Sequence, residues 1–246
     1  MKIKYSMAEI RGSHKIGRNW VHTFLLKPTV MGTTWLVANF TNISPNTISA
    51  ISGLFYIVCG YFFLTANLPW HLFWGAVFFY LGILLDAVDG KIARLKNKSS
   101  KFGAWFDSYI DVWGQSIAAI TLGYGYFLYT GNHVWLLLGG VMLFIKFHHN
   151  LESNVALQLM GEKNYERRIS KDNLGQTGLI GKIKGWLLKK GLRDPVSGSD
   201  IKVLFFVIGP MFLILDYILM IIIPIFLIKA VIWFFYYKKE LMLLDK

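Results

Sequence analysis

Long apolar stretches alternate with short polar segments along the chain. The longest apolar stretches cover residues 48–66, 71–85, 104–129, 134–147 and 201–237. About 20 helical residues cross a hydrocarbon core of about 30 Å, so the last stretch can hold two short helices, which we divide near Asp216. The pattern predicts an all-α integral membrane protein with six transmembrane helices. Five spans are the alternative, because two of the stretches are short.

Composition agrees with a membrane protein. The 246 residues are 54% hydrophobic and only 16% charged, with a mean hydropathy of +0.45, which excludes an ordinary soluble domain. The single cysteine, Cys59, lies in an apolar stretch, so the sequence has neither a disulfide framework nor a cysteine-based zinc site.

The basic residues predict the orientation in the membrane. All 26 Lys and Arg residues lie outside the three turns expected at 67–70, 130–133 and 215–217. Positive charge is retained on the cytoplasmic side of a membrane, so both termini are predicted to be cytoplasmic in a multi-pass protein of the cell membrane. The net charge of +12 therefore reports topology, and no nucleic acid partner is expected. Lys229 is an exception to the cytoplasmic placement of basic residues, because it lies halfway along the last predicted span.

Two polar regions flank or interrupt the spans. Residues 1–44 are predicted to form a cytoplasmic N-terminal segment with an amphipathic helix in the membrane interface, because Ile16, Trp20 and Phe24 follow helical spacing. Residues 150–199 are the longest polar stretch and carry few clustered apolar residues. We interpret them as a cytoplasmic loop with one amphipathic helix, not as a second domain.

Four carboxylates lie inside or at the edge of two predicted spans: Asp86, Asp89, Asp107 and Asp111. Each pair is three or four residues apart and therefore shares one helix face. Antiparallel packing of the two spans would bring all four together just below the cytoplasmic surface. An unpaired charge there costs several kcal/mol, so something must compensate the four.

Bound divalent cations, basic partners or protonation could each compensate these carboxylates. Arg94 and Lys229 are the only basic residues that we place near their depth, so pairing cannot neutralise all four. Oxygen ligands without nearby His or Cys favour Mg²⁺ or Mn²⁺, and two such ions would balance four negative charges. Metals of this kind usually hold phosphates.

The residues beside the carboxylates suit a phosphate ligand. Gly90, Ala93 and Gly103 leave the helix surfaces open to a bulky group, although small residues in membrane helices also serve close packing. Arg94 adds a planar cation at the same rim, suited to a phosphate oxygen.

The spacing of these eight residues resembles the signature of the CDP-alcohol phosphotransferase family. Its fixed positions correspond here to Asp86, Asp89, Gly90, Ala93, Arg94, Gly103, Asp107 and Asp111. The segment 44–49 also resembles the Pro-Asn-x-x-Thr/Ser element that opens the first span in that family, which adds Asn46 and Ser49 to the candidate ligand-binding residues.

The resemblance implies a six-helix catalytic domain over residues 45–246, usually a homodimer, in phospholipid biosynthesis. Such an enzyme transfers a phospho-alcohol group, here a phosphatidyl group, from a CDP-alcohol such as CDP-diacylglycerol to an acceptor alcohol and releases CMP. The implied metal ligands are Asp86, Asp89 and Asp107. Asp111 is implied as the general base, which can also contact a metal. Gly90, Ala93, Arg94 and Gly103 are implied to line the CDP site.

Two other functions stay open at this point. An intramembrane prenyltransferase also places aspartate-rich motifs over Mg²⁺ and a diphosphate, but the Gly-x-x-Ala-Arg continuation fits it poorly. A transporter with an acidic ion path is the alternative without catalysis. The sequence identifies neither the acceptor alcohol nor, firmly, the donor.

Overall fold

The computed structural model describes residues 4–12, 22–137, 139–144, 147, 158–159 and 198–244. All regular elements in these ranges are helices, as the hydrophobic pattern predicts. Most of the predicted loop at 150–199 and the segment 13–21 with Ile16 and Trp20 lie outside the described residues.

Two helices form an apolar hairpin at the centre of the fold. Helix α3 covers Pro45–Leu64 and helix α4 covers Pro69–Leu95, and both are long and apolar enough to cross a membrane. Each begins with a proline at its first position, where the missing backbone N–H has no helical partner to lose. The Ser44 hydroxyl caps α3 by accepting from the Thr47 backbone N–H at 3.1 Å. These two are the helices in the described chain that meet the length and hydropathy of a span, so six spans remain a prediction.

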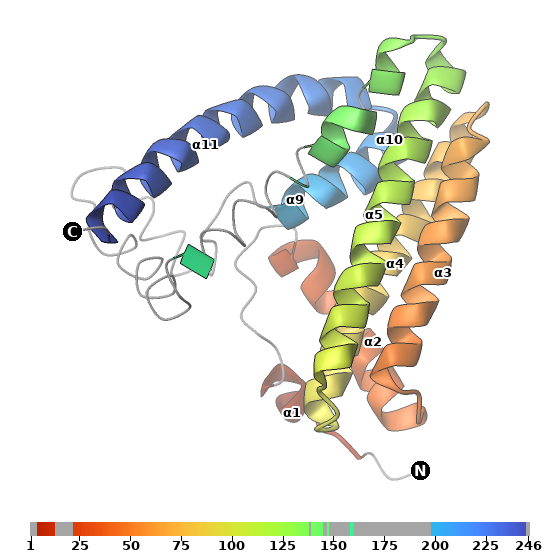
Figure 1. The fold of residues 1–246 in the computed structure, drawn as a ribbon. Coiled ribbons are helices and arrows are strands. Elements are labelled where there is room, and N and C mark those ends of the chain that lie inside the picture. Colours follow the sequence, from red (N-terminus) through yellow and green to blue (C-terminus); the bar gives the residue numbers. More distant parts are fainter. Residues whose placement is uncertain are drawn as a thin grey trace.

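Helix α5, Lys101–Thr130, packs along α3 and completes a three-helix bundle (Figure 1). The Ser100 hydroxyl caps its start, and Gly131, with a φ of 70°, ends it in the left-handed conformation. At Gly125 the helices approach so closely that an added Cβ would lie 1.8 Å from the Phe63 carbonyl oxygen. The absent side chain therefore sets the separation between α3 and α5.

The C-terminal elements cross the far end of this bundle. Short helices α9 (Gly198–Val203) and α10 (Gly209–Phe212) enclose the π-helical turn η2 (Leu204–Ile208), which packs on α4. Helix α11, Leu215–Leu244, starts beside α10 and extends away from the bundle (Figure 1). A break lies close to the predicted position, but the predicted turn at 215–217 is wrong because Leu215 already begins α11, and the division into two spans stays a prediction. The break lies at Leu213, whose φ is 57°, and Ile214 donates its backbone N–H to the Gly209 carbonyl at 3.0 Å.

The N-terminal segment folds against the opposite end of α4. It contains α1 (Met7–Gly12), the π-helical turn η1 (His22–Leu26) and α2 (Lys27–Phe40). The Asn39 side chain holds the start of the chain, because its oxygen accepts from the backbone N–H groups of Lys4 and Tyr5, both at 2.8 Å. Helix α2 buries Val30 and Ala38 against α4. A helix is thus present in the predicted region, while its position in a membrane interface stays a prediction.

Candidate functional site

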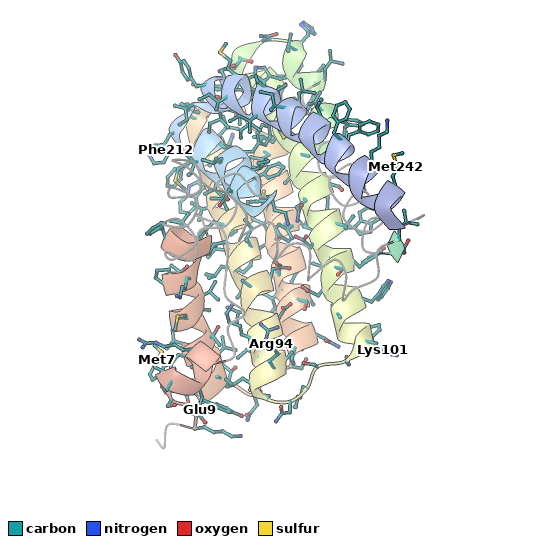
Figure 2. All side chains as sticks on the ribbon, turned by 90° about the vertical axis from the view of Figure 1, so that its left-hand side faces the viewer. Met7, Glu9, Arg94, Lys101, Phe212 and Met242 are labelled. Atoms are coloured by element: carbon teal, nitrogen blue, oxygen red, sulfur yellow. The ribbon has the colours of Figure 1, made fainter. Side chains whose placement is uncertain are left out.

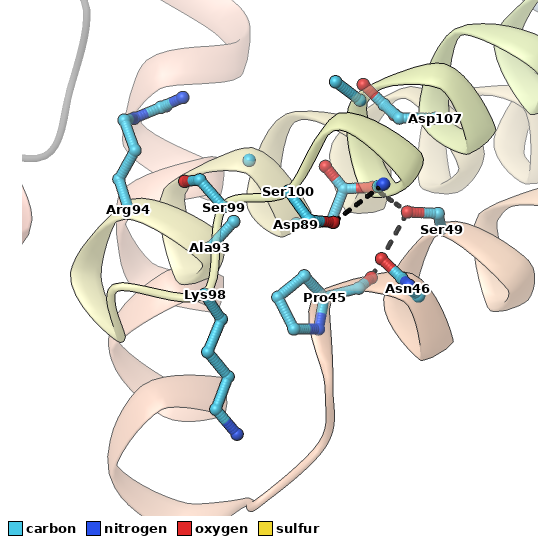
Figure 3. A pocket seen from close by; sticks show the side chains of 13 residues that line it. Pro45, Asn46, Ser49, Asp89, Ala93, Arg94, Lys98, Ser99, Ser100 and Asp107 are labelled. Carbon is cyan, nitrogen blue, oxygen red and sulfur yellow. Dashed lines mark hydrogen bonds between the residues drawn. The ribbon is translucent and has the colours of Figure 1, made fainter.

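A pocket of about 180 Å³ opens where the first turns of α3 and α5 meet the last turns of α4 (Figure 3). Eight of the ten residues predicted from the sequence line it: Asn46, Ser49, Asp89, Gly90, Ala93, Arg94, Gly103 and Asp107. In Figure 2, Arg94 and Lys101 lie toward the end of the bundle that carries Met7 and Glu9, and Phe212 lies toward the other. The structure therefore gathers six of the eight signature residues, together with the start of α3, around one cavity, whose lining does not include Asp86 and Asp111.

Asp89 is the most deeply buried carboxylate of the pocket, with 3% of its surface exposed. The Ser49 hydroxyl, on α3 and itself 3% exposed, donates a hydrogen bond to Asp89 Oδ2. Ser49 lies one helical turn beyond Pro45, so the start of α3 fixes its position. A buried carboxylate needs such a donor, and the bond holds one of its oxygens in a defined place.

Asp86 and Asp107 lie close to Asp89. Asp107 Oδ1 is buried and has no hydrogen-bond partner within the described part of the chain. Three adjacent carboxylates, one with an unsatisfied oxygen, are a donor set that fits Mg²⁺ or Mn²⁺. Among the described residues, no three Asp, Glu, His or Cys side chains already surround one point as ligands of a single ion do.

Asp111 is separated from the pocket lining and has a different environment. Gln115, one turn further along α5, donates its amide N–H to Asp111 Oδ1. Lys202 Nζ, on α9, lies 3.1 Å from Oδ2 and 3.3 Å from Oδ1. The expectation that only Arg94 and Lys229 could reach the depth of the carboxylates was therefore wrong, because a lysine 91 residues away in the chain is paired with Asp111.

The small residues of the signature allow close approach at the pocket. A Cβ at Gly103 would lie 3.0 Å from Asn46 Oδ1, so this glycine lets the beginnings of α3 and α5 meet. A Cβ at Gly90 would find only the Arg94 guanidinium within 4 Å, at 3.5 Å, so this position leaves room beside the cation. Both observations fit the prediction that these small residues leave room for a bulky ligand.

The turn between α4 and α5 adds lining residues that the sequence analysis missed: Lys98, Ser99 and Ser100. Lys98 brings a second cation to the rim that holds Arg94. Nearby, partial burial and then the charges of Lys98 and Lys4 lower the pKa of Lys96, whose Nζ donates to the Thr41 carbonyl at 3.3 Å. These three residues lie between the two halves of the signature, residues 86–94 and 103–111. That position in the sequence could have identified them as lining residues.

Fold and pocket together define an all-helical protein that has two helices long and apolar enough to cross a membrane, with carboxylates and cations lining one pocket at the end of its helices. A comparison with protein families gives the finer assignment. Residues 42–238 match the family model described as CDP-alcohol phosphatidyltransferase, and the chain belongs to this family.

Individual relatives match over shorter lengths. A protein of Aquifex aeolicus without assigned function is 35% identical over 106 residues, which is 43% of this chain and 52% of the relative. A CDP-diacylglycerol–serine O-phosphatidyltransferase of Helicobacter pylori is 34% identical over 61 residues, 25% of this chain and 26% of its own. An archaetidylinositol phosphate synthase of Pyrococcus horikoshii is 36% identical over 69 residues, 28% of this chain and 35% of its own. The matches thus span about half or less of these relatives.

Proposed function

We propose that this protein transfers a phosphatidyl or related phospho-alcohol group from a CDP-alcohol to an acceptor alcohol and releases CMP. The observation that carries the proposal is the convergence of six of the eight signature residues on one pocket, which Asp89 and Asp107 line together with Arg94 and Lys98. Family membership supports the same reaction class. An intramembrane prenyltransferase or a transporter has no such support.

The carboxylates Asp86, Asp89 and Asp107 are the residues that would hold two Mg²⁺ or Mn²⁺ ions. Bound there, the ions would neutralise diphosphate charge and make the phosphorus more electrophilic. Arg94 and Lys98 bind phosphate oxygens at the rim, and Gly90, Ala93 and Gly103 let the nucleotide approach the helix backbones. Ser49 holds Asp89 in place, and Asn46 adds an amide at the entrance.

Asp111 is the proposed general base. An acceptor hydroxyl must lose its proton as it attacks phosphorus, and a carboxylate within hydrogen-bond reach can take it. Lys202 and Gln115 fix the orientation of this carboxylate. A contact of Asp111 with a metal is compatible with this role.

The proposed substrates are based on the apolar bundle beside the pocket and on the names of the relatives. We propose CDP-diacylglycerol as donor, because an apolar helical bundle can accommodate its acyl chains beside the pocket. The acceptor is a polar alcohol. The names of the relatives include transfer to serine and synthesis of an inositol phosphate lipid, and this chain would take an acceptor of that polar kind.

A direct test incubates the purified protein with labelled CDP-diacylglycerol and candidate acceptors, with and without Mg²⁺ or Mn²⁺. We expect metal-dependent CMP release, which neither a prenyltransferase nor a transporter would give. Asp86→Asn, Asp89→Asn and Asp107→Asn should abolish release and weaken metal binding. Near-normal release from any of the three would overturn the metal assignment.

The Asp111→Asn variant tests whether Asp111 acts as a general base or only as a further metal ligand. We expect transfer to fall at least about a hundredfold, the low end for general base catalysis, while a CDP-alcohol analogue still binds at saturating Mg²⁺. If Asp111→Asn loses nucleotide and metal affinity as severely as Asp89→Asn does, Asp111 has no separate role as general base.

We also propose the membrane arrangement: six spans, both termini and the pocket on the cytoplasmic side of the cell membrane, and a homodimer. The apolar helices α3 and α4 and the absence of basic residues from the predicted outer turns support it. Single cysteines introduced at Asn132 and Lys184 should react with impermeant reagents from opposite sides, with position 184 cytoplasmic. Reaction of both from one side would require a different number of spans.

A further inference from the structure

Tyr56 lies in the centre of α3 beneath the carboxylates, and its side chain is 1% exposed. The ring fills the space left by two glycines on the neighbouring helices. A Cβ at Gly82 of α4 would lie 2.6 Å from Tyr56 Cε1, and one at Gly114 of α5 would lie 2.1 Å from Cδ2. The ring is therefore held between three helices and cannot turn away without moving one of them.

These two glycines place the ring close to the site. Gly82 is one helical turn before Asp86, and Gly114 is one turn after Asp111. The phenol group accordingly lies near both carboxylates, Asp86 and Asp111. Tyr56 is thus in the layer next to the metal-binding residues, on the side away from the pocket mouth.

The Tyr56 hydroxyl is buried and forms no hydrogen bond within the described part of the chain. The neighbouring hydroxyl of Ser52 donates instead to the Gly82 carbonyl, at 3.0 Å. A buried O–H without a partner costs about 1–3 kcal/mol, and a phenylalanine would fill the same space without that cost. Packing alone therefore does not explain a tyrosine here.

We propose that Tyr56 is a positioning residue whose O–H is joined through one water to the Asp86 or the Asp111 carboxylate, and that it so fixes the inner side of the metal site. The proposal deepens the proposed function and rests on it. Outer hydrogen bonds of this kind orient metal ligands, and their removal typically costs about 10–100-fold in metal affinity. A merely structural tyrosine would show no such effect.

The test compares Tyr56→Phe with wild-type protein by Mn²⁺ binding, followed by electron paramagnetic resonance, and by thermal unfolding without metal. We expect Mn²⁺ affinity to fall about tenfold or more, while the metal-free unfolding temperature stays the same or rises. Tyr126→Phe is the matched control, because Tyr126 is also 1% exposed but lies near the other end of α5. It should leave Mn²⁺ affinity within twofold of wild type.

The outcomes separate this inference from the proposed function. If wild-type protein binds Mn²⁺ and Tyr56→Phe binds it equally well, the positioning role is overturned and the metal site stands. Equal losses in Tyr56→Phe and Tyr126→Phe would also overturn it, since the effect would then follow from removing any buried phenol. If wild-type protein binds no Mn²⁺, the metal site fails and this inference fails with it.

Discussion

The hydrogen bond from Ser49 to Asp89 makes a quantitative prediction about the pocket. Ser49→Ala removes the hydroxyl and leaves Asp89 Oδ2 buried without that donor. A hydrogen bond to a charged group contributes about 1.5–3 kcal/mol when both partners are buried, and both side chains here are 3% exposed. Loss of an outer hydrogen bond that orients a metal ligand typically costs about 10–100-fold in metal affinity, so Mn²⁺ or Mg²⁺ affinity should fall by about this factor.

A matched control lies one turn further along α3. The Ser52 hydroxyl also joins α3 to α4, but it donates to a backbone carbonyl, that of Gly82, at 3.0 Å. Ser52→Ala removes a neutral hydrogen bond of about 1 kcal/mol and leaves the carboxylates unchanged. Both variants should lose some thermal stability, and only Ser49→Ala should lose metal affinity.

Isothermal titration with Mn²⁺ and CMP release from CDP-diacylglycerol measure the two effects separately. Transfer by Ser49→Ala should recover partly at high metal concentration, because the defect lies in holding Asp89. Metal affinity within twofold of wild type, or an equal loss in Ser52→Ala, would refute the assigned role of Ser49.

Two further predictions concern packing and the general base. Gly125→Ala should lower stability by about 3 kcal/mol in thermal unfolding, because its Cβ would meet the Phe63 carbonyl at 1.8 Å, whereas Gly140→Ala, with nothing within 4 Å, should be neutral or stabilising. Similar unfolding temperatures for the two would contradict the close approach of α3 and α5. Lys202→Met should lower kcat about tenfold or more with little change in unfolding temperature, because partly exposed ion pairs contribute about 0–1 kcal/mol to stability while orientation of Asp111 is lost. Wild-type kcat in this variant would show that Asp111 does not need its partner.

Much of the pocket follows from local spacing. Asp86 and Asp89 share a helix face by their separation in sequence, and so do Asp107 and Asp111. The caps at Ser44 and Ser100 define where α3 and α5 begin. These are short-range signals, and they place the signature at one end of the helices without knowledge of the remaining fold. In the structure Asp89 and Asp107 line the pocket, whereas Asp111 lies outside its lining and is paired with Lys202.

Contacts between residues far apart in the sequence could not be predicted in this way. Lys202 is 91 residues from Asp111, and in the sequence it counts only as one of many basic residues on the predicted cytoplasmic side. Tyr56 lies in an apolar stretch where an aromatic residue predicts a lipid-facing or core position. The break at Leu213 has no sequence signal either, because leucine rarely adopts a positive φ. All three depend on long-range packing.

Packing and chemistry are coupled through the same residues. Tyr56 lies between α4 and α5 at Gly82 and Gly114, each one turn from a carboxylate, so the ring contributes to the spacing of the helix segments that carry Asp86 and Asp111. A larger side chain at either glycine would displace the ring, and the carboxylates would move with their helices. Because protein interiors are close-packed and transmit such shifts, substitutions one turn below the pocket should impair transfer even where the protein still folds. The small residues beneath the site therefore act on its geometry as well as on helix association.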